Sequence, residues 1–161
     1  MLTSAQQATL KAFVVADPVL NLIPHTYDGA YAVVEALKAE ANPSFTVWRT
    51  DVPAGEIGNA WSGTDIDGMS ALNMQRLQLL LASSPVGTFD MSRIDRRNGF
   101  LNPFGTSPTN PSKVAMTAVF KRLANRLEKL LATGAGTDAS PATLVIEGSV
   151  SYQEVYSLMG W

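Results

Sequence analysis

Residues Thr133–Gly148, TGAGTDASPATLVIEG, decide how this chain is organised, because they separate a long helical pattern from the last short apolar run. Gly134 and Gly136 follow the predicted helix and precede the predicted strand Thr143–Glu147. A phosphate-binding loop has the opposite order, with glycines after a strand and before a helix, so that backbone N–H groups face the anion. The stretch is therefore predicted to end a helix, with Gly134 as the C′ residue at positive φ, and then to act as a hinge.

Helical patterns dominate the sequence before this hinge. The clearest one follows Ser112 as N-cap and is predicted to run over Lys113–Ala132. The run from Gly68 to Ser83 is apolar on more than one face and is predicted to be the most buried helix. The other helical segments are predicted over 4–16 behind a capping box, over 28–41 with Asp28 as N-cap, in a short stretch capped by Ser92 and interrupted at Asn98-Gly99, and in one or two turns that open with Ser151–Glu154.

Two short stretches have the composition of strands. Residues 44–50 and 143–147 are rich in β-branched and aromatic residues and are predicted to pair as a small ribbon. The fold class is therefore predicted to be mainly α, a helical bundle with a small two-stranded β element and an extended C-terminal arm. Residues 1–132 would form the helical body and residues 133–161 the hinge, short strand and arm of the same domain.

The composition favours a folded, non-enzymatic protein without cofactor or metal. The 161 residues are 46% hydrophobic and 16% charged, with no cysteine and one histidine, His25. That histidine lacks a nucleophile motif, and Asp65–Gly68 lacks the later ligands of a calcium loop. The N-terminus has no basic region followed by an apolar segment, and no apolar run approaches the roughly 20 residues that a bilayer requires, so the chain is predicted to be soluble and not secreted.

The charges are distributed unevenly along the chain. Residues 76–129 hold nine basic and three acidic residues, a net of +6, whereas the rest carries −8. Lys121, Arg122, Arg126 and Lys129 are spaced to share one face of the predicted long helix. This basic region, 93–129, leaves three alternatives open: contact with nucleic-acid phosphates, docking on an acidic protein, or a solvated face.

A resemblance to a known family adds a function to this outline. It is carried by Leu2–Ala12, by Pro43–Thr50, by Lys121–Leu130, and by Leu131–Thr143 followed by Glu147-Gly148 and Ser151–Val155. These stretches resemble a family of small virion structural proteins of tailed bacteriophages, whereas residues 60–112 match more weakly. The resemblance implies a head-to-tail connector, or adaptor, located in the virion neck after assembly in the host cytoplasm. It implies no catalytic residue.

The partners also follow from this resemblance. The protein would form a homo-oligomeric ring, twelvefold by analogy with portals, between the portal protein and neighbouring neck or tail proteins, in contact with genomic DNA in the channel and with no membrane. The binding residues expected are Tyr152, Val155, Tyr156, Leu158, Met159 and Trp161 in the apolar C-terminal arm, together with Arg122 and Arg126. Deleting residues 150–161 would then abolish portal binding and leave the helical body folded.

Three alternatives remain beside this reading. The C-terminal helix could pack on its own domain and not on a neighbour. The protein could be a tail-completion or capsid-associated structural protein. In a different class, it could be a nucleic-acid-binding factor that uses Arg93, Arg96, Arg97 and the predicted basic face.

Overall fold

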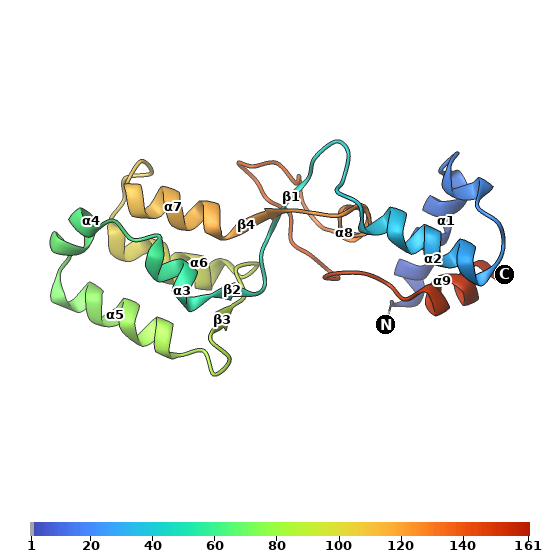
Figure 1. Cartoon of the computed structure of the whole chain (residues 1–161). Coiled ribbons are helices and arrows are strands. Elements are labelled where there is room, and N and C mark those ends of the chain that lie inside the picture. Colours follow the sequence, from blue (N-terminus) through green and yellow to red (C-terminus); the bar gives the residue numbers. More distant parts are fainter. Residues whose placement is uncertain (1) are drawn as a thin grey trace. The chain divides into compact units, whose positions relative to one another are not determined.

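The structure, a computed structural model, describes residues 2–161. It confirms the mainly helical class, with helices over 53% of the chain and two small two-stranded antiparallel sheets where one was expected. The residues form two compact units (Figure 1). Unit 1 contains the residues up to Val47 together with Leu123–Trp161, and unit 2 is Trp48–Arg122. The expected body 1–132 thus contributes to both units, whereas the expected arm 133–161 lies wholly in unit 1.

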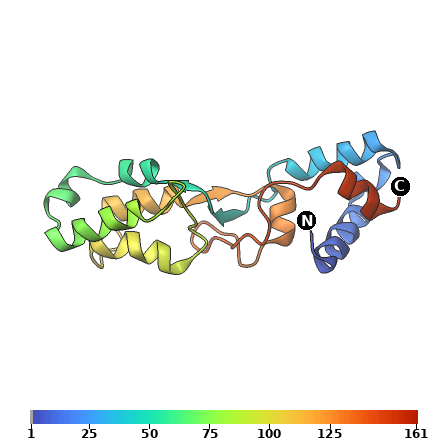
Figure 2. The same ribbon diagram turned by 90° about the horizontal axis from the view of Figure 1, so that it is seen from below.

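Unit 1 contains both ends of the chain. Its elements are α1 (Ser4–Ala16), the 3₁₀ helix η1 (Leu20–Leu22), α2 (Tyr27–Lys38), α8 (Arg126–Leu131) and α9 (Tyr152–Met159). Helix α1 has the predicted bounds and begins with the predicted capping box between Thr3 and Gln6. Figure 2 shows α1, α2 and α9 grouped together, as Figure 1 does from another direction. Their apolar faces form the core of the unit, with Leu10, Val33 and Val155 almost fully buried.

The N-cap of α2 differs from the predicted one. Thr26 has the extended backbone of an N-cap, and its hydroxyl accepts a 3.1 Å hydrogen bond from the amide of Gly29. Asp28 lies inside the first turn, where its negative charge interacts favourably with the helix dipole. The helix ends at Lys38 and not at Ala41.

The predicted long helix over 113–132 is wrong. The segment contains α7 (Pro111–Val119), the strand β4 (Lys121–Leu123) and α8. Asn125 and Glu128 form a capping box, with the Asn125 side chain accepting from the Glu128 amide at 2.8 Å. An N-cap residue is extended, and Asn125 has φ −79° and ψ 174°, so no helix can continue through it. Gly134 consequently does not follow a long helix, although its φ is positive, at 125°.

The predicted pairing of the two strands is also wrong. Strand β1 (Thr46–Trp48) pairs with β4, and residues 143–147 form no strand. The segment after Gly136 nevertheless reaches β1, because Ala142 donates its amide to the Thr46 carbonyl at 2.9 Å. Val47, Ala124 and Ala142 are buried together around this contact.

The stretch from Thr133 to Gly148 is held at several points, unlike a free hinge. Thr133 and Thr143 exchange backbone hydrogen bonds of 2.9 and 2.8 Å, which closes the loop between them. Within the loop, the Gly136 carbonyl accepts from the Thr46 amide at 2.7 Å. Gly136 has φ +66°, and a Cβ on it would lie 2.0 Å from the ring of Phe45. Glycine is therefore required there both for conformation and for space.

The buried carboxylate of Glu128 fixes the far end of this stretch. Its side chain accepts hydrogen bonds from the amides of Asn125 and Gly148, both at 3.0 Å, and the residue is only 1% exposed. The Asn125 side-chain amide donates in turn to the Gly148 carbonyl at 2.9 Å. Both backbone groups of Gly148 are thus bound to the first turn of α8. We call these three residues the Glu128 clamp.

Unit 2 has a core of its own. Its elements are β2 (Val52–Pro53), α3 (Ala54–Asn59), α4 (Gly63–Asp67), α5 (Ala71–Ala82), β3 (Thr88–Phe89), α6 (Ile94–Leu101), the 3₁₀ helix η2 (Asn102–Phe104) and α7. Strands β2 and β3 pair antiparallel, with Val52 opposite Phe89. Three aromatic rings pack in a row in this core. The ring centroid of Phe100 lies 5.0 Å from that of Phe89 and 6.3 Å from that of Phe120.

Two helix predictions in unit 2 are wrong. Helix α5 was expected to be the most buried, but only Leu77 in it is fully buried, and Leu72 and Leu79 are 56% and 64% exposed. Helix α6 continues through Asn98-Gly99. A Cβ added at Gly99 would lie only 3.2 Å from the side chain of Leu80, so the glycine leaves room for the close packing of that leucine. Ser92 does not cap α6, since its hydroxyl donates to Asp90 at 2.6 Å.

Asp65 joins α4 to the start of α7. Its carboxylate accepts from the amide and the hydroxyl of Ser112, at 3.0 and 2.6 Å, and from the side chain of Asn110 at 2.8 Å. Asn110, and not Ser112, is the N-cap of α7. These hydrogen bonds, that of the Ser112 hydroxyl first, lower the pKa of Asp65. The residue therefore has a structural role within unit 2.

Removal of the Glu128 carboxylate should destabilise unit 1. We expect Glu128→Ala to lower the free energy of unfolding by about 3 kcal/mol, because two amides lose a charged acceptor. Urea unfolding followed by circular dichroism measures this loss. Glu35→Ala is the matched control, since Glu35 forms only an exposed 2.7 Å pair with Lys38 and should cost below about 0.5 kcal/mol. Equal losses in both variants would contradict a structural role for the clamp.

Two glycine substitutions separate close approach from backbone strain. Gly136 and Gly148 both lie at positive φ, at 66° and 89°, but only Gly136 has atoms within 4 Å of an added Cβ. Alanine at either position incurs a left-handed backbone cost of roughly 1–2 kcal/mol. Overpacking against Phe45 should add about 1–3 kcal/mol in Gly136→Ala. Thermal unfolding of the two variants gives the difference, and a Gly148→Ala as unstable as Gly136→Ala would refute the contact with Phe45.

Candidate functional site

The six C-terminal residues predicted to bind a partner lie on their own unit. Helix α9 packs mainly against α2 and also against α1. Val155 is buried, and Tyr156, Leu158, Met159 and Trp161 are half-buried against the same core. Tyr152 is the most exposed of the six, at 39%. The arm is therefore docked within the chain, which is the alternative that the sequence left open.

The end of the chain is held by two further contacts. Trp161 stacks on the ring of His25, with centroids 4.7 Å apart and planes 11° from parallel. Lys11 of α1 donates to the Leu158 carbonyl at 3.1 Å. Deletion of residues 150–161 would therefore remove part of the core of unit 1, including Val150 and Val155. This packing argues against the expectation that the helical body would fold without them.

A cluster of tyrosines forms the most distinctive surface of unit 1. Tyr27 stacks on Tyr156 with centroids 4.1 Å apart and meets Tyr152 edge-on at 6.3 Å. Beside them is a hollow of about 480 Å³, which we call the tyrosine pocket; it is lined by Tyr27, Asp28, Tyr31, Tyr152 and Gln153. Tyr27 and Tyr31 are more than half exposed, at 58% and 56%.

The two arginines expected to bind a partner are not free for that purpose. Arg126 forms a 2.5 Å ion pair with Asp17 and lies over the ring of Phe13, at 5.4 Å from its centroid. Arg122 lies in β4 and is half-buried. Lys129 donates to the Pro43 carbonyl at 2.9 Å. Because 121–123 is a strand, the basic helical face predicted over 121–129 does not exist.

Most cations of unit 2 are also engaged within the fold. Arg97 donates to the carbonyls of Met91 and Ser92 and lies 4.0 Å from the centroid of the Trp48 ring. Arg93 pairs with Asp95 at 2.8 Å. Arg76 is different: within residues 2–161 it has no hydrogen bond or ion pair, and it is exposed. Unit 2 has eight basic and six acidic residues, a net of +2, and unit 1 has four and eight, a net of −4.

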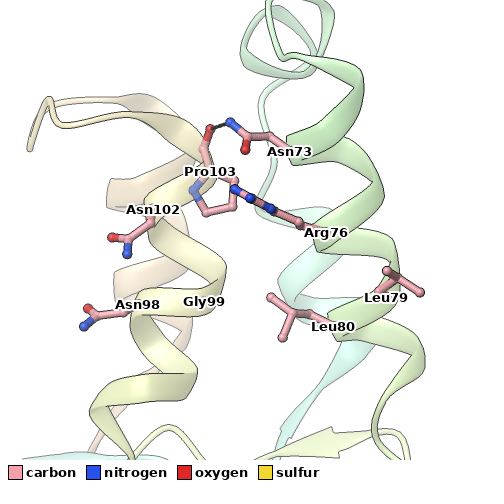
Figure 3. A pocket seen from close by; sticks show the side chains of 8 residues that line it. All are labelled: Asn73, Arg76, Leu79, Leu80, Asn98, Gly99, Asn102 and Pro103. Atoms are coloured by element: carbon pink, nitrogen blue, oxygen red, sulfur yellow. Dashed lines mark hydrogen bonds between the residues drawn. The ribbon is translucent and has the colours of Figure 1, made fainter.

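Arg76 stands at the edge of a groove between α5 and the end of α6 (Figure 3). The groove has a volume of about 430 Å³ and is lined by Asn73, Arg76, Leu79, Leu80, Asn98, Gly99, Asn102 and Pro103. Asn73 donates to the Pro103 carbonyl at 3.1 Å across one end. The Arg76 side chain extends from α5 toward Pro103, whereas Leu79 points away from the groove (Figure 3). Leu72, Arg76 and Leu79 are all exposed and, at spacings of four and three, share one helical face.

Neither a metal-binding cluster nor a membrane-spanning helix is found among the described residues. Residues 2–161 contain no group of three or more His, Cys, Asp or Glu side chains placed to hold a metal ion. No helix in the same range combines the length and the hydropathy needed to cross a bilayer. Comparison with protein-family models, curated protein sequences and solved structures gives no significant match.

Neither the tyrosine pocket nor the exposed face of α5 around Arg76 could be predicted from the sequence, because each depends on tertiary packing. Tyr27 and Tyr31 are four residues apart on a helix, a spacing that could have indicated a shared face. Tyr152 joins them only because α9 docks on α2. Leu72 and Leu79 belong to the helix that the sequence predicts to be the most buried, so hydropathy alone does not indicate an exposed face around Arg76.

The ion pair between Asp17 and Arg126 should make the stability of unit 1 depend on pH. Hydrogen bonds from the amides of Leu20 and Val19 and the guanidinium of Arg126 hold the pKa of Asp17 below its ordinary value of 3.8. A lowered pKa stabilises the fold above pH 3.8, and this contribution is lost as the pH falls through the folded-state pKa. We expect Asp17→Asn to lower the free energy of unfolding by about 1–2 kcal/mol at pH 7.

The difference between Asp17→Asn and the wild type should shrink as the pH falls below 3.8. Urea unfolding at a series of pH values measures it. Asp28→Asn is the control, because the Asp28 carboxylate accepts no hydrogen bond within residues 2–161. A gap between Asp17→Asn and the wild type that stays constant down to the lowest pH would contradict the assignment.

Proposed function

We propose that this protein is a structural component of a tailed-bacteriophage virion, a non-enzymatic head-to-tail connector that forms a ring between the portal and the tail. Its site of action would be the virion neck. The phage assignment rests on the sequence resemblance in the segments Leu2–Ala12, Pro43–Thr50, Lys121–Thr143, Glu147-Gly148 and Ser151–Val155. The structure adds support for the role as a subunit of an assembly.

The observation that carries this role is the apolar surface that each unit leaves open. In unit 2, the leucine-rich helix α5 has only Leu77 fully buried and exposes Leu72 and Leu79. In unit 1, Tyr27 and Tyr31 are more than half exposed. Exposed apolar and aromatic side chains that gather on a helix face are typical of protein–protein interfaces. A subunit of a ring needs two such surfaces, one for each neighbour.

The nucleic-acid alternative receives less support from the side chains. A phosphate-binding surface needs several free cations on one face. Arg93, Arg97, Arg126 and Lys129 are instead held by contacts within the fold. The tail-completion and capsid-associated alternatives differ from the connector only in the position of the protein in the particle, which the following experiment determines.

The position can be tested in purified particles. We expect mass spectrometry of the virion to detect the chain, and electron microscopy of the purified protein with portal to show a ring on the portal. A cysteine label is convenient for gold or fluorophore attachment, because the chain has no cysteine of its own. Label at the neck supports the connector. Label at the tail tip or over the shell, or absence of the chain from particles, would overturn it.

A further inference from the structure

Helix α5 of unit 2 exposes one arginine and two leucines. Arg76 is exposed on α5 without a hydrogen bond or ion pair within residues 2–161, and Leu72 and Leu79 flank it on the same helical face. An exposed guanidinium on the same helix as two exposed leucines is suited to a partner that combines apolar contact with a negative charge. Arginine at the centre of such a face is a common energetic anchor of protein interfaces. We call Leu72, Arg76 and Leu79 the α5 face.

Unit 1 presents a surface of complementary chemistry. The tyrosine pocket combines the exposed rings of Tyr27, Tyr31 and Tyr152 with the carboxylate of Asp28. Asp28 is exposed and, within residues 2–161, forms no hydrogen bond or ion pair through its carboxylate. Tyrosine rings attract cations through their negative faces, and a carboxylate beside them adds direct charge attraction. The pocket is therefore suited to a guanidinium.

We propose that these two surfaces bind each other between copies of this chain: Arg76 of one copy enters the tyrosine pocket of the next, against Asp28 and the tyrosine rings. Leu72 and Leu79 then cover the rim of the pocket and exclude water from the ion pair. The proposal deepens the proposed function and rests on it, since it names the contact that joins neighbouring subunits of the ring.

The charge balance of the units favours a second copy as the occupant. Unit 2 carries +2 and unit 1 carries −4, so the α5 face of one molecule is attracted to the tyrosine pocket of another. The two surfaces differ, which makes the contact heterologous. A heterologous contact repeats from copy to copy and closes into a ring when the rotation permits. A phosphate ligand would be repelled by Asp28.

Cysteine cross-linking tests the contact directly, because the chain has no cysteine. Gln153→Cys, in the tyrosine pocket, and Leu79→Cys, on the α5 face, both keep Asp28 and Arg76; the two chains are purified separately, mixed at high concentration and treated with a short bismaleimide. We expect a covalent dimer in the mixture and little in either variant alone. Val86→Cys replaces Leu79→Cys in the control mixture, since Val86 is 78% exposed in unit 2 but outside the α5 face. Equal yields in the two mixtures would overturn the proposal.

The chain carrying both Gln153→Cys and Leu79→Cys separates contact between copies from contact within one chain. A ladder of covalent oligomers is expected. A cross-linked monomer alone would overturn the proposal.

Charge reversal gives an independent measurement. Sedimentation at increasing concentration should show self-association weakened at least about tenfold by Asp28→Arg and by Arg76→Asp, because each places like charges together. The combined variant should restore it. Both residues are exposed, and circular dichroism confirms that each variant is folded. Association unchanged in the single variants, or not restored in the combined one, would overturn the contact.

The experiments distinguish a failure of this proposed contact from a failure of the proposed connector function. A ring at the neck of the particle without the cross-link between positions 153 and 79 keeps the connector and removes this contact. A cross-link in the purified protein, with the chain absent from particles, keeps the contact and removes the connector.

Discussion

The Glu128 clamp is the interaction on which unit 1 depends. A carboxylate that is 1% exposed must have its oxygens satisfied, and here the amides of Asn125 and Gly148 do so. The same side chain begins α8 and holds the chain 20 residues later. Because the Asn125 amide also binds the Gly148 carbonyl, the direction of the chain at Gly148 is fixed. The segment after Gly148 therefore leads to α9, which packs against α2 and α1.

This constraint explains why the stretch after α8 is not a hinge. The loop is closed near its start by Thr133 and Thr143, is held to Thr46 at Gly136, and is held again at Gly148. With both ends fixed, α9 can dock on α2 without the loss of conformational freedom that a mobile linker would impose. The tyrosine pocket is a product of this docking, since one of its walls comes from α9 and the other from α2.

Local signals in the sequence predicted the local features and failed where tertiary contacts decide. The capping box at Thr3 correctly predicted where α1 begins, because a cap involves only neighbouring residues. The apolar pattern over 113–132 suggested one helix, yet the capping box of Asn125 and Glu128 lay within it unrecognised. Leu79 was assigned to the core because hydropathy does not distinguish a residue buried within a chain from one on an open surface.

The candidate surfaces extend the same argument to function. The apolar C-terminal residues were expected to bind a partner, but most of them pack α9 against its own unit, and only Tyr152 remains substantially open. The surface available to a partner therefore consists of what the docked helix and α2 present together. On the other unit, Arg76 is open because α5 packs through a narrow stripe around Leu77. A helix that buries one stripe exposes the opposite one, and on α5 that opposite stripe carries Leu72 and Leu79 beside Arg76.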